Sequence, residues 1–196
     1  LINRVKPHTS FRGPVESGVI KMMIIGMGKI NGATAIHGGH PMENFGEVLP
    51  RAAGALMEHI PFLFGVGMVE DAHDDTAIVE AMPAETLFAR EPVLQSRAKE
   101  LMARIYIDDI DVLVIDEIGK EISGAGCDPN VTGHRNSPGF ELPRVKKMVI
   151  LDVTDATKGN ATGIGSADVI THRLLGRVDF AATYANTVTS TYLEGA

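Results

Sequence analysis

The 196-residue chain contains no tryptophan and a single cysteine, and these scarcities narrow what the protein can be. Cys127 alone excludes an internal disulfide and fits a reducing compartment, so we expect a cytoplasmic protein. Aromatic residues make up 5% of the chain, too few for a surface that stacks nucleic-acid bases. The formal net charge is −7 and the basic residues do not cluster. Both observations argue against nucleic acid or an anionic membrane as a partner. No apolar run approaches the roughly 20 residues of a membrane span.

The remaining composition is that of a globular chain, with 44% hydrophobic and 22% charged residues. Predicted strands and helices alternate, which predicts an α/β fold: a mixed sheet with flanking helices, organised as two α/β units. We place the boundary near residue 107, giving domains at residues 1–107 and 108–196. The opening residues read as the end of a strand, so we expect the chain to be an internal or C-terminal fragment of a longer protein.

Helices are predicted where apolar residues recur at helical spacing. One spans residues 44–60, and a second spans residues 91–105 with Pro92 in its first turn. A third, over residues 166–175, has Ser166 as its N-cap. Residues 19–27 fit either a strand or a short buried helix, and periodicity does not decide between them. The glycines that follow, Gly26, Gly28 and Gly32, allow tight turns.

Strands are predicted at four apolar runs: residues 62–70, 76–82, 112–116 and 147–153. The first two are joined by a short polar turn and predict a β-hairpin. The run at residues 112–116 (VLVID) is typical of a sheet covered on both faces. Residues 119–139 are rich in glycine, proline and asparagine and predict a long irregular loop.

Three side chains near the N-terminus carry the strongest chemical signal. His8, Lys21 and His37 stand in a glycine-rich, otherwise apolar stretch. Two imidazoles and an amine can serve as a proton shuttle, a metal ligand and a covalent anchor. Simpler explanations exist for each: Lys21 at the edge of its element would extend its charge to water, and the histidines would be loop residues bonded to backbone. Arg12 beside His8 offers a contact for an anionic group or is merely solvated.

Other motifs are weaker. The acidic run with His73 at residues 70–75 has donor types that bind metals, but a polar hairpin turn explains it more simply. Residues 159–165 resemble a phosphate-cradling glycine loop before a helix, without the Lys-Ser/Thr of a P-loop. Lys120 follows the predicted strand at residues 112–116, at the strand end that faces ligands in α/β sheets.

The N-terminal pattern resembles the nickel-dependent lactate racemase family, and more closely the broad group of its uncharacterised relatives. The shared features are Pro7-His8, Lys21 in a glycine-bounded apolar segment, and His37 sixteen residues after that lysine. The similarity covers residues 1–107, and the remainder looks like the start of the family's second domain. One departure is the segment Glu16-Ser17-Gly18, where the lactate enzyme has a more basic, glycine-rich run.

The resemblance implies an isomerase with an organonickel pincer cofactor, a pyridinium-3,5-dithiocarboxylic acid mononucleotide made by dedicated cofactor-synthesis proteins. By that resemblance Lys21 is the thioamide tether, His37 the protein ligand of nickel, and His8 one of two acid/base histidines. The implied reaction is racemisation or epimerisation of a 2-hydroxy acid by hydride transfer to the cofactor and back.

Three further residues complete the expected site. Arg12 and Gly18 are expected to bind the cofactor, and Lys120 is the candidate catalytic residue for holding the substrate carboxylate. Two alternatives stay open from the residues alone. One is a non-catalytic module whose glycine loops bind a nucleotide or anion, and the other is a divalent-metal hydrolase built on residues 70–75.

Overall fold

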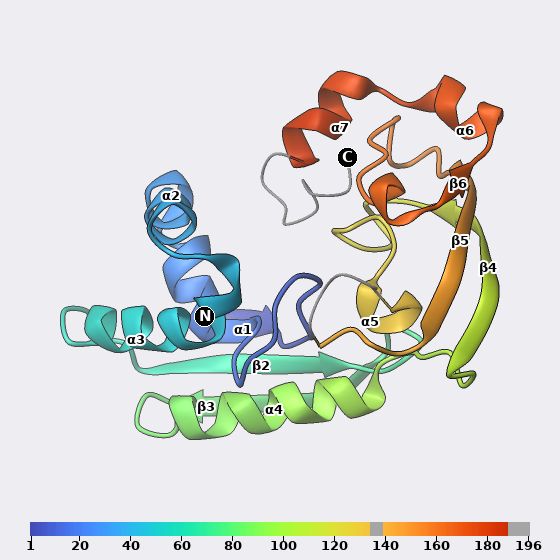
Figure 1. The fold of residues 1–196 in the computed structure, drawn as a ribbon. Helices are drawn as coiled ribbons and strands as arrows, with labels where there is room; N and C mark the ends of the chain where they lie inside the picture. Colours follow the sequence, from blue (N-terminus) through green and yellow to red (C-terminus); the bar gives the residue numbers. More distant parts are fainter. Residues whose placement is uncertain (134–138, 188–196) are drawn as a thin grey trace. The chain divides into compact units, whose positions relative to one another are not determined.

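The computed structural model describes residues 1–133 and 139–187. The chain divides into two compact units, Leu1–Ala103 and Arg104–Ala196, close to the boundary expected near residue 107 (Figure 1). Each unit holds a three-stranded sheet with flanking helices, one sheet mixed and one parallel. The predicted α/β fold class is therefore confirmed.

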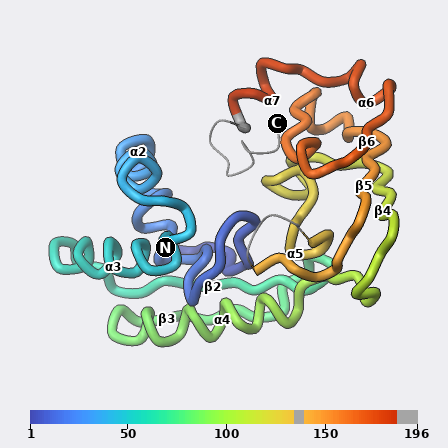
Figure 2. The backbone as a smooth tube through the Cα atoms, viewed as in Figure 1, coloured from blue at the N-terminus to red at the C-terminus, as the bar shows by residue number. Residues whose placement is uncertain are grey.

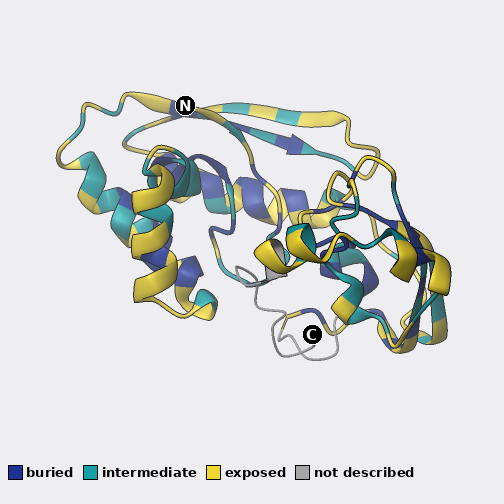
Figure 3. Cartoon of the chain, turned by 90° about the horizontal axis from the view of Figure 1, so that it is seen from above, coloured by how far each residue is buried: buried dark blue, intermediate teal, exposed yellow. Residues whose placement is uncertain are grey.

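The sheet of the first unit has the strand order β1-β2-β3. Strand β1 (Ile2–Arg4) runs parallel to β2 (Phe64–Glu70), and β3 (Thr76–Pro83) pairs antiparallel with β2. The predicted hairpin is thus confirmed. Residues of β2 alternate between buried and less buried positions, as expected for a strand with one face on a core (Figure 3).

Residues 19–27, which fitted either a strand or a helix, are helical as far as Gly26. Helix α1 (Gly18–Lys21) continues into a π-helical turn, η1 (Met22–Gly26). Helix α2 (Lys29–Gly39) follows, where the sequence predicted only turns, and Gly32 lies inside it. A Cβ on Gly28 or Gly32 would lie 2.2 or 2.3 Å from the Ile24 carbonyl oxygen, so these glycines serve a close approach of α2 to η1.

In the described ranges, 1–133 and 139–187, no single helix is long and apolar enough to cross a membrane. The segments Gly18–Gly26 and Lys29–Gly39 reach that length and composition only together, and they are bent by 104° relative to one another.

Two longer helices complete the first unit: α3 (Phe45–Met57), preceded by the short turn η2 (Met42–Asn44), and α4 (Leu87–Leu101). The prediction for α3 is confirmed at its centre. Helix α4 begins four residues earlier than predicted, so Pro92 lies inside the helix and its placement in the first turn was wrong. The earlier start follows from Leu87, which is fully buried, and from Thr86, whose carbonyl accepts the first helical bonds from Ala89 and Arg90.

The second unit is built on a parallel sheet of order β4-β5-β6. Its strands are β4 (Asp109–Ile118), β5 (Arg144–Val153) and β6 (Val169–Ile170). Val112 and Val114 of β4 are 54% and 53% exposed, so the expectation of a sheet covered on both faces was wrong. Val112 and Val114 alternate along β4 with Leu113 and Ile115, which pack on the core of the unit, so among the described residues only one face of this part of β4 is covered.

Short helices follow these strands (Figure 2): α5 (Pro129–Thr132), the turn η3 (Ile164–Ser166), α6 (His172–Arg177) and α7 (Phe180–Thr187). The helix predicted over residues 166–175 was wrong in its start. Ser166 ends η3, and the N-cap is Thr171, whose hydroxyl accepts from the Leu174 amide at 3.0 Å. Helix α5 interrupts the predicted loop at residues 119–139, whose positions 134–138 lie outside the described residues.

Candidate functional site

The structure brings together the three side chains that the sequence singled out. His8 lies in the loop after β1, Lys21 ends α1, and His37 lies in the last turn of α2. The His8 ring lies 4.4 Å from the Phe11 ring, and Lys21 Nζ lies 5.8 Å from the centre of that ring. The His37 ring packs edge-on against Phe45 at 5.0 Å, and Phe45 packs edge-on against Phe11 at 5.7 Å. These five residues are called the N-terminal cluster below.

His8 is a neutral imidazole whose protonation pattern is set by its surroundings. Burial, together with the charges of Lys21, His37 and Arg12, lowers the pKa of His8 to about 3, and burial is the largest of these causes. The Ser10 backbone N–H donates to His8 Nδ1 at 3.0 Å. A backbone N–H only donates, so Nδ1 carries no proton and the neutral ring holds its proton on Nε2. His8 therefore presents a hydrogen-bond donor at Nε2.

Lys21 is a partly buried amine with reduced basicity. Burial lowers the pKa of Lys21 to about 8, while the negative charge of Glu16 acts in the opposite direction. Its Nζ donates to the Glu16 backbone carbonyl at 3.5 Å and lies over the Phe11 ring. An amine with this pKa has an appreciable uncharged fraction at neutral pH, so it can act as a nucleophile toward a carbonyl or acyl carbon.

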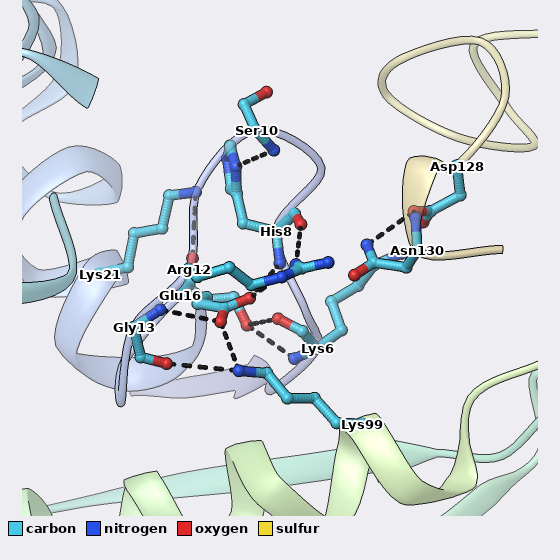
Figure 4. A network of polar contacts seen from close by, with 11 residues as sticks. Lys6, His8, Ser10, Arg12, Gly13, Glu16, Lys21, Lys99, Asp128 and Asn130 are labelled. Carbon is cyan, nitrogen blue, oxygen red and sulfur yellow. Dashed lines mark hydrogen bonds and ion pairs between the residues drawn. The ribbon is translucent and has the colours of Figure 1, made fainter. Parts of the chain in front are cut away.

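A buried carboxylate, Glu16, holds the loop that carries His8 (Figure 4). Its oxygens accept the backbone N–H groups of His8 at 2.8 Å and Gly13 at 3.0 Å. Two cations balance its charge: Lys99 Nζ lies at 2.5 Å and Arg12 Nη1 at 3.6 Å. Glu16 is fully buried, and a buried carboxylate is tolerated because these donors replace its water.

A second buried carboxylate, Glu91, caps the helix that carries Lys21. It accepts the backbone N–H groups of Val19 at 2.7 Å and Ile20 at 3.1 Å. Burial raises the pKa of Glu91 to about 7, although these two bonds favour the charged form. A Cβ at Gly18 would lie 2.7 Å from the Glu91 carboxyl carbon, and Gly18 has φ +91°, so only glycine fits this approach.

The other predicted site residues have structural contacts of their own. Arg12 Nη1 donates to the His8 carbonyl at 3.1 Å, so the guanidinium braces the loop of the cluster. Gly18 lies against Glu91 as described above. Lys120 belongs to the second unit, where it follows β4; its backbone N–H donates to Thr157 Oγ1 at 3.3 Å and its Nζ to the Gly124 carbonyl at 3.4 Å.

The weaker motifs find simple explanations. Asp71 Oδ1 accepts the backbone N–H groups of His73 at 2.8 Å and Asp75 at 3.2 Å, which closes the turn between β2 and β3. No group of three or more His, Cys, Asp or Glu side chains that could hold a metal occurs in the described part of the chain. The glycine loop at residues 159–165 leads into η3 and β6, and the next α-helix starts only at His172.

Sequence reasoning missed the residues that assemble the site: Phe11, Phe45, Lys99 and Glu91, with Glu16 noted only as a departure from the resemblance. Phe45 lies within the helix predicted over residues 44–60, and nothing in the local sequence links it to His37. The spacing of Glu91 and Lys99, two helical turns apart on one face of α4, is the signal that was present in the sequence.

Comparisons with family models, with curated proteins and with solved structures find no match for the chain.

Proposed function

We propose that this protein racemises or epimerises a 2-hydroxy acid with a lysine-tethered nickel-pincer cofactor. The observation that carries the proposal is the convergence of His8, Lys21 and His37, from three separate segments, around Phe11 and Phe45. The spacing of these residues in the sequence supports the resemblance. Their proximity in the structure would allow them to act in one site.

The chemistry of the cluster fits such a group. Burial already disfavours the charged form of Lys21, and conversion of the amine to a thioamide would remove that charge altogether. His37 offers an imidazole nitrogen, a donor that suits nickel, and Phe45 supports its ring. By the resemblance, Lys21 would hold the cofactor and His37 would ligate its metal. When bound, the cofactor would supply the acceptor for the hydride.

His8 would act on the substrate oxygen. Its Nε2–H is a donor to the carbonyl oxygen of a 2-oxo acid, the oxidised partner of a 2-hydroxy acid. Taking up the proton of a substrate hydroxyl would require the other tautomer, in which Nε2 is unprotonated and Nδ1 no longer accepts the Ser10 N–H. Phe11 and Phe45 are themselves buried, and they give the site an apolar wall beside these polar groups.

We also propose a cytoplasmic location, because the chain's single cysteine, Cys127, is consistent with a reducing compartment. The partners would be a small 2-hydroxy acid and the proteins that synthesise the cofactor.

The test is a peptide mass across Lys21 with a nickel analysis, on protein purified from cells that make the cofactor. We expect an added mass on Lys21 and about one nickel per chain, and loss of both in Lys21→Ala. The exposed Lys29 provides the control, because Lys29→Ala should keep the added mass and the metal. An unmodified Lys21 without nickel in such cells would reject the proposal and favour the anion-binding module.

The two histidines should separate in the same assay. We expect His37→Ala to keep the added mass on Lys21 and to lose most of the nickel, because only the metal ligand is removed. His8→Ala should keep both mass and nickel and lose turnover of 2-hydroxy acids by about a hundredfold or more. Equal nickel content in wild type and His37→Ala would contradict the assignment of His37.

A further inference from the structure

Helix α4 presents a stripe of polar residues to the segments that carry the cluster. Glu91, Gln95 and Lys99 are spaced by four residues, so they lie on one face of the helix. Glu91 binds the start of α1, and Lys99 Nζ reaches both the Glu16 carboxylate at 2.5 Å and the Gly13 carbonyl at 3.5 Å. None of the three has a place among the expected catalytic, cofactor-binding or metal-binding residues.

Glu16 connects this stripe to the cluster in two ways. Its carboxylate accepts the backbone N–H of His8, which fixes the chain at the imidazole, and its backbone carbonyl accepts from Lys21 Nζ. Glu16 therefore contacts both His8 and Lys21, the two chemically active residues of the loop and α1. Lys99 is the closest cation to that carboxylate, and it comes from an element far away in the sequence.

We propose that Glu16, held by its counter-ion Lys99, is a positioning residue that places His8 and sets the reactivity of the Lys21 amine. For its chemical purpose this inference rests on the proposed function. Glu16 lies in the segment where the chain departs from the lactate enzyme, so its role comes from the contacts in this structure and from no carried-over motif.

The direction in which the Lys21 pKa shifts in variants of Glu16 and Lys99 distinguishes an electrostatic effect on Lys21 from a purely structural support of the loop. Among the described residues, Glu16 is the charged group that opposes the lowering of the Lys21 pKa by burial. Loss of its charge should lower the Lys21 pKa further. Loss of Lys99 removes the nearer of the two cations at Glu16 and leaves Arg12 at 3.6 Å, so the less compensated Glu16 charge stabilises the Lys21 ammonium and the Lys21 pKa should rise. A merely structural pair would give shifts of the same direction in both variants, because either change would loosen the same loop.

The experiment is the pH dependence of acetylation of Lys21 by acetic anhydride, read from the mass of the Lys21 peptide in protein made without the cofactor. For Glu16→Gln we expect a lower midpoint and about a threefold faster reaction at pH 7, equivalent to about half a pKa unit. For Lys99→Met we expect a higher midpoint and a slower reaction of similar size. Lys99→Arg should restore the wild-type profile, and Glu47→Gln on α3, an exposed position, is the control for the loss of a negative charge.

Shifts in the same direction, or an unchanged profile in both folded variants, would overturn the inference. Where Glu16→Gln fails to fold by circular dichroism, Lys99→Met decides alone, since its side chain is 40% exposed and the change removes no buried group. The measurement needs neither nickel nor cofactor, so its outcome is independent of the peptide mass that tests the proposed function. Opposite shifts in a protein that never acquires the cofactor would keep the positioning role and reject the nickel chemistry.

Discussion

The tautomer of His8 is determined by a single backbone contact. Ser10 N–H donates to Nδ1, and the half-buried ring lies near Lys21, Arg12 and His37. We expect the imidazole to stay neutral down to about pH 4, with its proton on Nε2. Two-dimensional ¹H–¹⁵N spectroscopy of the histidines checks this: the His8 Nδ1 shift should be that of an unprotonated nitrogen between pH 5 and 8. A ring that titrates near its ordinary pKa of 6.5 would contradict the structure.

Glu91 should make stability fall as the pH rises. Its pKa is about 7 in the folded protein against an ordinary value of 4.5, so between these two values the folded state binds more protons than the unfolded state. The stabilisation is fully present below pH 4.5 and is lost as the pH rises through 7. Glu91→Gln removes this dependence and keeps an acceptor for Val19 and Ile20.

Urea denaturation of the wild type and of Glu91→Gln at pH 5 and pH 8 measures that change. We expect the free energy of unfolding of the variant to gain on the wild type by up to about 3 kcal/mol between the two conditions. The opposite pH dependence of His8 is common to both proteins and cancels in the difference. A difference that does not change with pH would show that Glu91 ionises normally.

His8, Lys21 and His37 were predicted from the sequence as site residues, but the residues that surround them were not. Chemically active residue types and their spacing are visible in a single chain. The contacts of Glu16 with Lys99 and of Phe45 with His37 depend on how α4, α2 and α3 pack, and no local pattern encodes them.

Among the elements, those with a clear apolar period were predicted and those defined by other forces were not. Strands β2 and β3 and helix α3 follow their hydrophobic pattern. Helix α2 has only Ile36 buried, so its sequence shows no apolar stripe from which a helix could be predicted. Its glycines allow the close approach to η1. The start of α6 was displaced because the two residues of β6 pair with β5, a tertiary contact that overrides the local helix signal.

Helix α4 carries the clearest stability prediction at the scale of elements. Gln95 is 2% exposed, and neither atom of its amide has a hydrogen-bond partner among the described residues. An unsatisfied buried amide costs about 1–3 kcal/mol, so Gln95→Leu should raise the free energy of unfolding by about 1 kcal/mol. The neighbouring Leu94→Ala, which opens a cavity in the same face, should lower it by about 3 kcal/mol. A destabilised Gln95→Leu in urea denaturation would show that the amide is satisfied, for example by a buried water.

For the whole molecule, two separate cores explain why the α/β class was predictable from the sequence. Buried side chains of the first unit cluster between its sheet, α1 and α4, with a second group around Phe11 and Phe45. Buried side chains of the second unit cluster on one face of its parallel sheet. Alternating strands and helices in the sequence indicate such cores. The exposure of one face of β4 depends instead on which elements cover the sheet, and the apolar run VLVID does not encode this.

Independent cores predict that the first unit folds without the second. Every contact that we describe for the N-terminal cluster, Glu16, Glu91 and Lys99 lies within Leu1–Ala103, and that unit buries an apolar core of its own. Residues 1–103 expressed alone should therefore unfold cooperatively and keep the lowered acetylation midpoint of Lys21. Brief trypsin treatment of the full chain should cut first after Arg104, an exposed residue between α4 and β4. A Lys21 in residues 1–103 that titrates as an ordinary lysine would show that burial of the amine requires the second unit.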